Sequence, residues 1–174
     1  MTTPAPRPDR LPVEGRIRPV TDADADALTA LVGAAYAEHP GCVLDLPGVD
    51  ADLTAPRRTF DARGGDLWVV EDADGGVVAC GGWKPATVDG EPAVELSRLY
   101  VAARARRRGL AAWLVGQVER VGRERGAALV TLWSDTRFAD AHRLYERLGY
   151  ERQPGTRELH DPSDTTEYEF RRRL

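Results

Sequence analysis

The fold is decided by one stretch, Glu95-Leu-Ser-Arg-Leu-Tyr-Val-Ala-Ala-Arg-Ala-Arg-Arg-Arg-Gly-Leu-Ala-Ala-Trp-Leu114. An apolar segment over residues 94–101, which we predict to be a strand, runs into a loop that holds four arginines in five residues. The segment after this loop places apolar side chains at helical spacing, at Leu110, Trp113, Leu114, Val118 and Val121. The sequence therefore predicts a strand, an arginine-rich turn and a helix in direct succession.

The turn before this helix has the properties of an anion-binding site. A helix N-terminus presents N–H groups without partners and the positive end of the helix dipole, and both attract phosphate. Gly109 allows a ligand to approach the backbone closely, and the arginines add positive charge. Arginine is the ordinary basic residue of this chain, since Lys84 is its only lysine, so Gly109 carries more of the argument. We expect a ligand with a phosphate or pyrophosphate.

Two motifs resemble those of the GNAT superfamily of N-acetyltransferases. Residues 106–111, Arg-Arg-Arg-Gly-Leu-Ala, resemble the cofactor-binding signature of that family, Arg/Gln-x-x-Gly-x-Gly/Ala. Residues 141–150, Ala-His-Arg-Leu-Tyr-Glu-Arg-Leu-Gly-Tyr, are similar to its later helix end, Ala-x-x-Leu-Tyr-x-x-x-Gly-Phe/Tyr. The resemblance is closest over residues 94–150 and extends more loosely from Arg16 to the C-terminus.

This resemblance implies a co-substrate and a reaction. The co-substrate is acetyl-CoA, and the reaction is transfer of its acetyl group to a primary amine by direct attack in a ternary complex. The residues implied in binding acetyl-CoA are Leu99, Tyr100, Val101, Arg106, Arg107, Arg108, Gly109, Leu110 and Ala111. Backbone N–H groups near Leu99–Val101 are expected to meet the oxyanion.

The order of apolar patterns predicts one domain over residues 1–174, with the Pro-rich residues 1–14 as a flexible tail. The predicted strands cover residues 16–20, 67–71, 77–83, 94–101, 127–133 and 165–171, and the predicted helices cover residues 21–38, 53–60, 110–125 and 138–148. This order matches the fold that the GNAT resemblance implies. That fold is of the α/β (α+β) class, with a central, mostly antiparallel mixed β-sheet of about six to seven strands flanked by about four helices.

Composition limits the cellular location and the binding partners that we expect for the protein. No window approaches the roughly 18 consecutive apolar residues of a membrane span, and the N-terminus lacks the apolar region of a secretory signal. A net charge of −4 argues against binding to nucleic acid or anionic membranes. Cys42 and Cys80, the only cysteines, fit a reducing cytoplasm. We expect a cytoplasmic, bacterial protein, and these observations are compatible with a homodimer.

Two residues are candidates for proton transfer. Glu95 is a carboxylate in an otherwise apolar strand, where the family's histone-acetylating branch has a catalytic glutamate. It is either the general base or the partner of Arg98 or another arginine in a buried ion pair. Tyr145 matches the helix-end tyrosine that can protonate the coenzyme sulfur in the family, and core packing is the other interpretation of its position.

The acceptor is expected to be a small, positively charged amine. In the family the acceptor site is formed by the first helix, the loop after it and the final hairpin. The aromatic candidates for substrate contact are Tyr36 and Trp83, and further acidic or aromatic residues of these segments are Asp45, Asp50, Asp52, Glu167 and Tyr168. Acids and aromatic rings suit a cationic amine.

One departure from the family pattern keeps a second class of function open. Where the family often has an asparagine that touches the pantetheine, this chain has Phe138. Asp135 and Thr136 are expected to be N-cap residues of the following helix. The alternative is a non-catalytic acetyl-CoA-binding sensor or interaction module on the same fold. A protein N-terminus or lysine is the alternative substrate.

Other enzyme classes lack their motifs. The three histidines have no ligand-like spacing, so we expect no metal. Neither a P-loop nor the Gly-x-Gly-x-x-Gly dinucleotide-binding motif is present.

Overall fold

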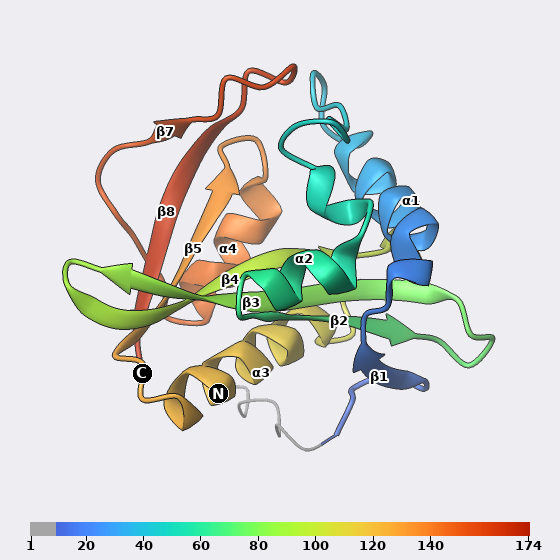
Figure 1. The fold of residues 1–174 in the computed structure, drawn as a ribbon, viewed down its shortest axis with the longest axis horizontal. Coiled ribbons are helices and arrows are strands. Elements are labelled where there is room, and N and C mark those ends of the chain that lie inside the picture. The colour runs from blue at the N-terminus through green and yellow to red at the C-terminus, as the bar shows by residue number, and fades with distance from the viewer. Residues whose placement is uncertain (1–9) are drawn as a thin grey trace.

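A computed structural model describes residues 10–174 as one mixed β-sheet with helices on both faces (Figure 1). The strands are β1 (Arg16–Pro19), β2 (Asp66–Glu71), β3 (Val77–Val88), β4 (Glu91–Val101), β5 (Leu129–Asp135), β6 (Glu151–Arg152), β7 (Arg157–Glu158) and β8 (Thr166–Arg173). The helices are α1 (Ala25–Tyr36), α2 (Pro56–Ala62), α3 (Leu110–Glu124) and α4 (Ala139–Arg147), and short 3-10 turns are η1 (Asp22–Asp24), η2 (Ala51–Leu53) and η3 (Ala103–Ala105).

The sheet confirms the predicted fold class. Its strand order is β1-β2-β3-β4-β5-β8-β6, with β7 also paired to β8. Every pairing is antiparallel except that between β4 and β5. The sheet has eight strands, against the six to seven expected, because the two-residue strands β6 and β7 also pair with β8.

The N-terminal residues were expected to form a tail over residues 1–14. Residues 1–9 lie outside the described part of the chain. Leu11 and Val13 pack against the buried cluster that contains Leu110 and Trp113 of α3.

Two helices cover each face of the sheet. Leu28 of α1 and Phe60 of α2 are fully buried in one cluster with Leu67 of β2. On the other face, Val118 of α3 and Tyr145 of α4 share a cluster with the strand residues between them. Figure 1 shows α1 and α2 above the sheet and α3 below it. Among residues 10–174, no helix is long and apolar enough to cross a membrane.

The two central strands separate at their carboxyl ends. β4 and β5 pair only between residues 93–95 and residues 129–131, although β4 continues to Val101 and β5 to Asp135. The register between β3 and β4 shifts near Arg98, whose backbone is left-handed with φ 53°. Such a bulge bends a strand and increases its twist. Beyond Glu95, therefore, β4 follows β3 and leaves β5.

The start of α4 differs from the prediction. Phe138, not Asp135 or Thr136, is the N-cap residue, and it makes no side-chain capping bond. The Asp135 carboxylate is instead engaged by Arg137, whose backbone N–H and guanidinium donate to it at 2.8 and 2.6 Å. Asp135 thus forms an ion pair with Arg137 instead of capping α4.

Candidate active site

A cleft of about 110 Å³ lies where β4 and β5 separate. Its walls come from both strands, from α1 and α4, and from the loops after α1 and before β8. The residues lining it are Tyr36, Cys42, Val49, Leu96, Arg98, Leu99, Tyr100, Leu132, Trp133, Ser134, Asp135, Phe138, Ala141, Tyr145, Leu159, Asp161, Ser163, Thr165 and Glu167. The separation of β4 and β5 thus creates a cleft whose walls come from elements that are distant in sequence.

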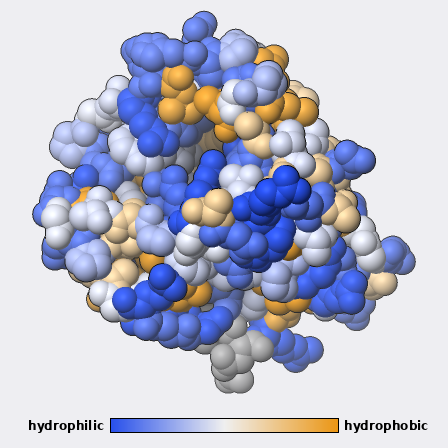
Figure 2. Space-filling model, in the orientation of Figure 1, coloured by the Kyte–Doolittle hydropathy of each residue, from blue (hydrophilic) through white to orange (hydrophobic). Residues whose placement is uncertain are grey.

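The rim of this cleft includes apolar surface. Figure 2 shows hydrophobic residues at the top of the view, over the region where Figure 1 places the loop after α1. Val43 and Val49, both in this loop, are 48% and 40% exposed. Val49 also lines the cleft.

The N-terminus of α3 lies at the end of the connection from β4. Gly109 is its N-cap residue and has a left-handed backbone with φ 81°, a conformation that favours glycine. Among the atoms of residues 10–174, a Cβ at this position would meet only Pro12 Cβ, at 3.9 Å. Residues 106–109 are exposed, and the first N–H groups of an α-helix have no partner within the helix. This geometry suits an anion such as a pyrophosphate.

The arginines before α3 differ in how they are held. The Arg106 guanidinium donates to both carboxylate oxygens of Glu38 at 2.7 Å and to the carbonyl oxygen of Val101 at 2.9 Å. Within residues 10–174, neither Arg107 nor Arg108 forms an ion pair. The charges available to a ligand are therefore those of Arg107 and Arg108, while Arg106 braces the turn against the end of α1.

The end of β4 offers one backbone edge to the cleft. On its other edge, Tyr100 and Val101 pair with Cys80 and Ala79 of β3. In the described part of the chain, the edge toward β5 has no strand partner beyond Glu95. An extended ligand with amide groups could pair with this edge as a strand would.

Tyr145 reaches the cleft from α4. It is 6% exposed, its ring packs near Tyr150 and Phe170 at centroid distances of 6.0 and 5.6 Å, and it lines the cleft. Burial raises the pKa of the Tyr145 phenol far above its usual value. The hydroxyl is therefore protonated at neutral pH and can act as a proton donor.

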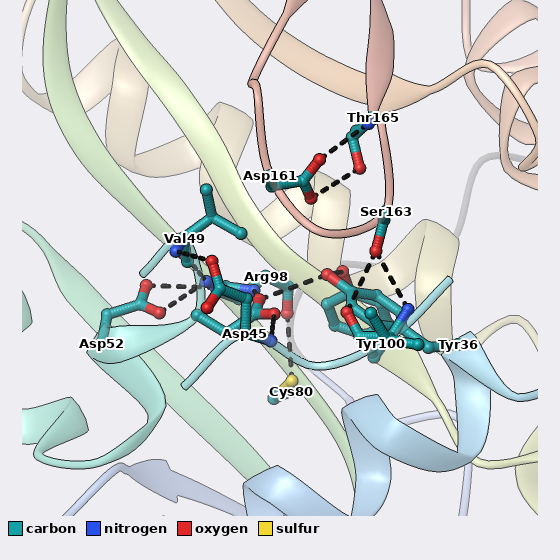
Figure 3. A network of polar contacts seen from close by, with 12 residues as sticks. Tyr36, Asp45, Val49, Asp52, Cys80, Arg98, Tyr100, Asp161, Ser163 and Thr165 are labelled. Carbon is teal, nitrogen blue, oxygen red and sulfur yellow. Dashed lines mark hydrogen bonds and ion pairs between the residues drawn. The ribbon is translucent and has the colours of Figure 1, made fainter. Parts of the chain in front are cut away.

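A network of buried charges fixes the loop after α1 to β4 (Figure 3). The Arg98 guanidinium donates to Asp50 Oδ1 at 2.7 Å, to Asp52 Oδ2 at 3.1 Å and to the carbonyl oxygen of Val49 at 2.9 Å. Both carboxylates are buried, and the Arg98 side chain is only 13% exposed. The residue that carries the left-handed bend of β4 therefore also holds the loop that forms one wall of the cleft.

Aromatic rings form the wall next to this network. The hydroxyl of Tyr36 donates to Asp50 at 3.3 Å, and that of Tyr100 donates to Tyr36 at 3.4 Å. Burial raises the pKa of Tyr36 to about 12. Phe138 lies 6.1 Å from the Tyr36 ring and 4.6 Å from the His39 ring. Phe138 thus connects α4 to the end of α1.

A second loop, residues 159–165, closes the cleft from the side of β8. Ser163 accepts from the backbone N–H of Val43 at 3.0 Å and donates to the Val43 carbonyl at 3.1 Å. Asp161 accepts from the backbone N–H and the hydroxyl of Thr165 at 2.7 and 2.8 Å. Figure 3 shows Asp161, Ser163 and Thr165 on the loop beside Tyr36 and Tyr100. Sequence reasoning missed this loop because its only signal was a turn.

Glu167 lines the cleft from β8. Arg157 Nε donates to its Oε2 at 2.6 Å, and the same guanidinium lies over the Trp133 ring at 4.1 Å. Burial raises the pKa of Glu167. The sequence indicates Glu167 as one of the acidic residues near the acceptor. Nothing in the sequence indicates that Arg157 and Trp133 are its neighbours.

Of the predicted catalytic residues and aromatic substrate residues, Tyr145 and Tyr36 line the cleft, and Glu95 and Trp83 do not. Val101 and residues 106–111, predicted to bind acetyl-CoA, are not among its lining residues either. Glu95 Oε1 lies 3.1 Å from Lys84 Nζ, so its ion-pair partner is the lysine and not Arg98. Trp83 is 7% exposed within the core, with the Arg125 guanidinium 4.7 Å over its ring. The side chain of Trp83 lies on the face of the sheet that α3 covers, so it is not on the acceptor side.

Metal-ligand side chains do not cluster in the described part of the chain. Among residues 10–174, no group of three or more histidine, cysteine, aspartate or glutamate side chains is close enough to hold a metal ion.

Comparison with known proteins agrees with this geometry. The model of the acetyltransferase (GNAT) family matches residues 33–150. No curated protein matches the chain.

Solved structures with a similar fold cover nearly the whole chain. A GNAT-family acetyltransferase from Staphylococcus aureus Mu50 has a TM-score of 0.75 at 16% identity, over 91% of this chain and 98% of its own. A phosphinothricin acetyltransferase from Sinorhizobium meliloti, in complex with acetyl-CoA, has a TM-score of 0.71 at 17% identity, over 93% and 89%. A ribosomal-protein-alanine N-acetyltransferase from Brucella melitensis has a TM-score of 0.67 at 24% identity, over 91% and 99%.

Proposed function

The chain belongs to the acetyltransferase (GNAT) family, and from this premise we propose that it transfers the acetyl group of acetyl-CoA to a primary amine of a small, positively charged molecule. The observation that carries the proposal is that the end of β4 leads to two features. Leu99 and Tyr100, near the end of β4, line the cleft that opens between β4 and β5. The connection after β4 leads to the helix N-terminus at Gly109, where Arg107 and Arg108 form no ion pair among the described residues. An elongated phosphate-bearing ligand fits such an arrangement.

Acetyl-CoA supplies an activated thioester, so the chain must bind it, orient it and move protons. The pyrophosphate would be bound by the N–H groups of residues 109–111 together with Arg107 and Arg108. The pantetheine arm would pair with the free edge of β4 over residues 99–101, whose N–H groups would also polarise the thioester carbonyl. Tyr145 would donate its proton to the departing thiolate.

The charge balance of the cleft supports a cationic acceptor. Three carboxylates line it, those of Asp135, Asp161 and Glu167, against the guanidinium of Arg98. Arg98 is already bonded to Asp50 and Asp52. Of the three carboxylates, Asp135 is paired with Arg137 and Glu167 with Arg157, so Asp161 is the one without an ion pair among the described residues. Tyr36, Trp133 and Phe138 add aromatic surface that attracts cations. The cleft volume of about 110 Å³ favours a small amine over a folded protein surface.

A thiol-release screen with acetyl-CoA tests the proposal. The panel includes polyamines, amino acids, aminoglycosides and N-terminal peptides, the last because one structural relative is a ribosomal-protein-alanine N-acetyltransferase. Small cations should react fastest, and their kcat/KM should fall with ionic strength, because salt screens charges beyond about 8 Å. A preference for peptides would contradict the acceptor class. Acetyl-CoA binding with no thiol release across the panel would favour the sensor alternative.

A further inference from the structure

The three carboxylates that line the cleft differ in how their oxygens are used. Arg137 donates to both oxygens of Asp135, at 2.8 and 2.6 Å. Thr165 donates to both oxygens of Asp161, at 2.7 and 2.8 Å. Glu167 receives a hydrogen bond only at Oε2, from Arg157. Among the described residues, Glu167 is thus the cleft carboxylate with one oxygen, Oε1, left without a donor.

The surroundings of Glu167 hold the carboxylate in one place. Arg157, on β7, is held from two sides, by its bond to Glu167 and by stacking on Trp133 of β5. A planar guanidinium clamped in this way fixes the direction of the hydrogen bond that it donates. Because Arg157 engages Oε2, the oxygen available to a ligand in the cleft is Oε1, which has no donor among the described residues.

The other charges that face Glu167 are already balanced. Asp135, its direct neighbour in the β5–β8 register, is paired with Arg137. Glu95, on β4, is paired with Lys84. Burial raises the pKa of Glu167, Asp135 and Glu95 add to the rise, and Arg157 lowers it. A carboxylate whose pKa lies nearer to neutral pH is a better proton acceptor than an exposed one.

We propose that Glu167 is the general base of the acetyl transfer and that Arg157 is its positioning residue. This inference rests on the proposed function and replaces Glu95 in the role that the family resemblance implied for it. Each carboxylate has one oxygen in an ion pair, Glu95 with Lys84 and Glu167 with Arg157, but only Glu167 lines the cleft.

The proposed step is balanced as follows. Glu167 Oε1 takes one proton from the acceptor ammonium, directly or through one water, and leaves a neutral amine with a lone pair. The nitrogen forms a bond to the acetyl carbon and the carbon–sulfur bond breaks. The thiolate takes its proton from the Tyr145 hydroxyl. The second proton lost by the new amide nitrogen returns to the tyrosinate through solvent, and Glu167 releases its proton to solvent.

The test compares Glu167→Gln with two control variants. Glu169→Gln changes a carboxylate on the same face of β8 that is bonded to Arg171 and does not line the cleft. Glu95→Gln changes the rival base. With the fastest amine of the panel, Glu167→Gln should lower kcat/KM near neutral pH by about 100-fold or more, with recovery at high pH where the amine loses its proton unaided. Glu169→Gln should stay within about threefold of the wild type, and Glu95→Gln should lose far less activity than Glu167→Gln.

The pH profile separates a base from a mere binding group. The kcat/KM of the wild type should fall at acidic pH as Glu167 becomes protonated. The pH profile of Glu167→Gln should lack this acidic limb. Arg157→Gln should shift the limb to higher pH, because the charge that lowers the pKa of Glu167 is removed. Glu167→Asp should keep the limb at a reduced rate, since it retains a carboxylate, and this variant also serves if Glu167→Gln does not fold.

Each contrary result has a distinct meaning. A Glu167→Gln variant with only a raised KM and the wild-type pH profile would show that Glu167 binds the ammonium and is not the base. Loss of activity in Glu95→Gln with Glu167→Gln intact would restore Glu95 to the role. If the wild type releases no thiol with any amine, the transfer function itself is wrong and the base is wrong with it.

Discussion

The two ends of the cleft are built in opposite ways. At the cofactor end, residues 106–109 are exposed and two arginines make no ion pair within the described chain. At the acceptor end, charged side chains are largely buried and paired, as with Arg98, Asp50 and Asp52. Substitutions at the cofactor end should therefore change binding and leave the fold intact. At the acceptor end they should cost stability as well.

The largest expected effect is at the buried network. Arg98→Leu leaves Asp50 and Asp52 without their main partner and should lower the free energy of unfolding by about 3–5 kcal/mol. Chemical denaturation measures the loss. Adding Asp50→Asn and Asp52→Asn to the Arg98→Leu variant should restore much of it, because no buried charge then remains uncompensated.

Arg120→Leu is the matched control for this comparison. It removes an exposed i,i+4 ion pair with Glu124 on α3 and should change stability little. An Arg98→Leu protein as stable as the Arg120→Leu protein would mean that the network does not hold the acceptor loop.

The next effect tests the cofactor end. Gly109→Glu should weaken acetyl-CoA binding by about 100-fold or more, because like charges near a protein surface repel by about 3 kcal/mol at close range. Titration calorimetry measures the affinity. Gly126→Glu makes the same change at the other end of α3, at a comparable φ of 71° and with open space around it.

Both glycine variants carry the same backbone strain, about 1–2 kcal/mol, so the Gly126→Glu protein shows what strain alone does. It should bind acetyl-CoA normally. Equal affinities of the two variants would place the pyrophosphate elsewhere.

A smaller effect separates catalysis from packing on α4. Tyr145→Phe should keep acetyl-CoA affinity and lower kcat by about 10–10³-fold, because the proton donor is lost. Tyr150→Phe removes the neighbouring buried hydroxyl, which is bonded to Glu119 at 3.3 Å, and should affect stability rather than kcat. Unchanged kcat in Tyr145→Phe would leave Tyr145 with core packing alone.

The smallest expected effect concerns the arginines of the turn before α3. Arg107→Ala and Arg108→Ala should each weaken acetyl-CoA binding by about threefold to tenfold, because their charges are free to meet phosphate. Arg106→Ala should change acetyl-CoA affinity less than either of these variants, since the Arg106 guanidinium is already bonded to Glu38 and Val101. Arg106→Ala with the largest loss of affinity would contradict this division.

The contrast between the two ends also explains what the sequence could predict. The cofactor end is one continuous stretch, so the strand, Gly109 and the helix could be predicted from local spacing. The acceptor end joins β4, β5, β8 and two loops, and its pairings are set by tertiary structure. Neither the hydrogen bond from Arg157 to Glu167 nor the stacking of the Arg157 guanidinium on Trp133 could be predicted from residues that are close in sequence.

The contacts of Trp83 and Glu95 could not be derived from the sequence, for the same physical reason. The strand that contains Trp83 was predicted correctly, but which face covers its ring depends on how α3 crosses the sheet. The partner of Glu95 depends on the β3–β4 register, which brings Lys84 directly opposite. A one-residue change of register reverses every side chain of a strand, so sequence alone could not assign either contact.

The most direct test of the central claim, that acetyl-CoA lies along the free edge of β4 with its pyrophosphate at the start of α3, is an NMR titration of the backbone amides with coenzyme A. The largest shifts are expected at residues 99–101 and 109–111, with little change at residues 119–126 at the other end of α3. Shifts confined to other parts of the chain, with these two segments unchanged, would contradict it.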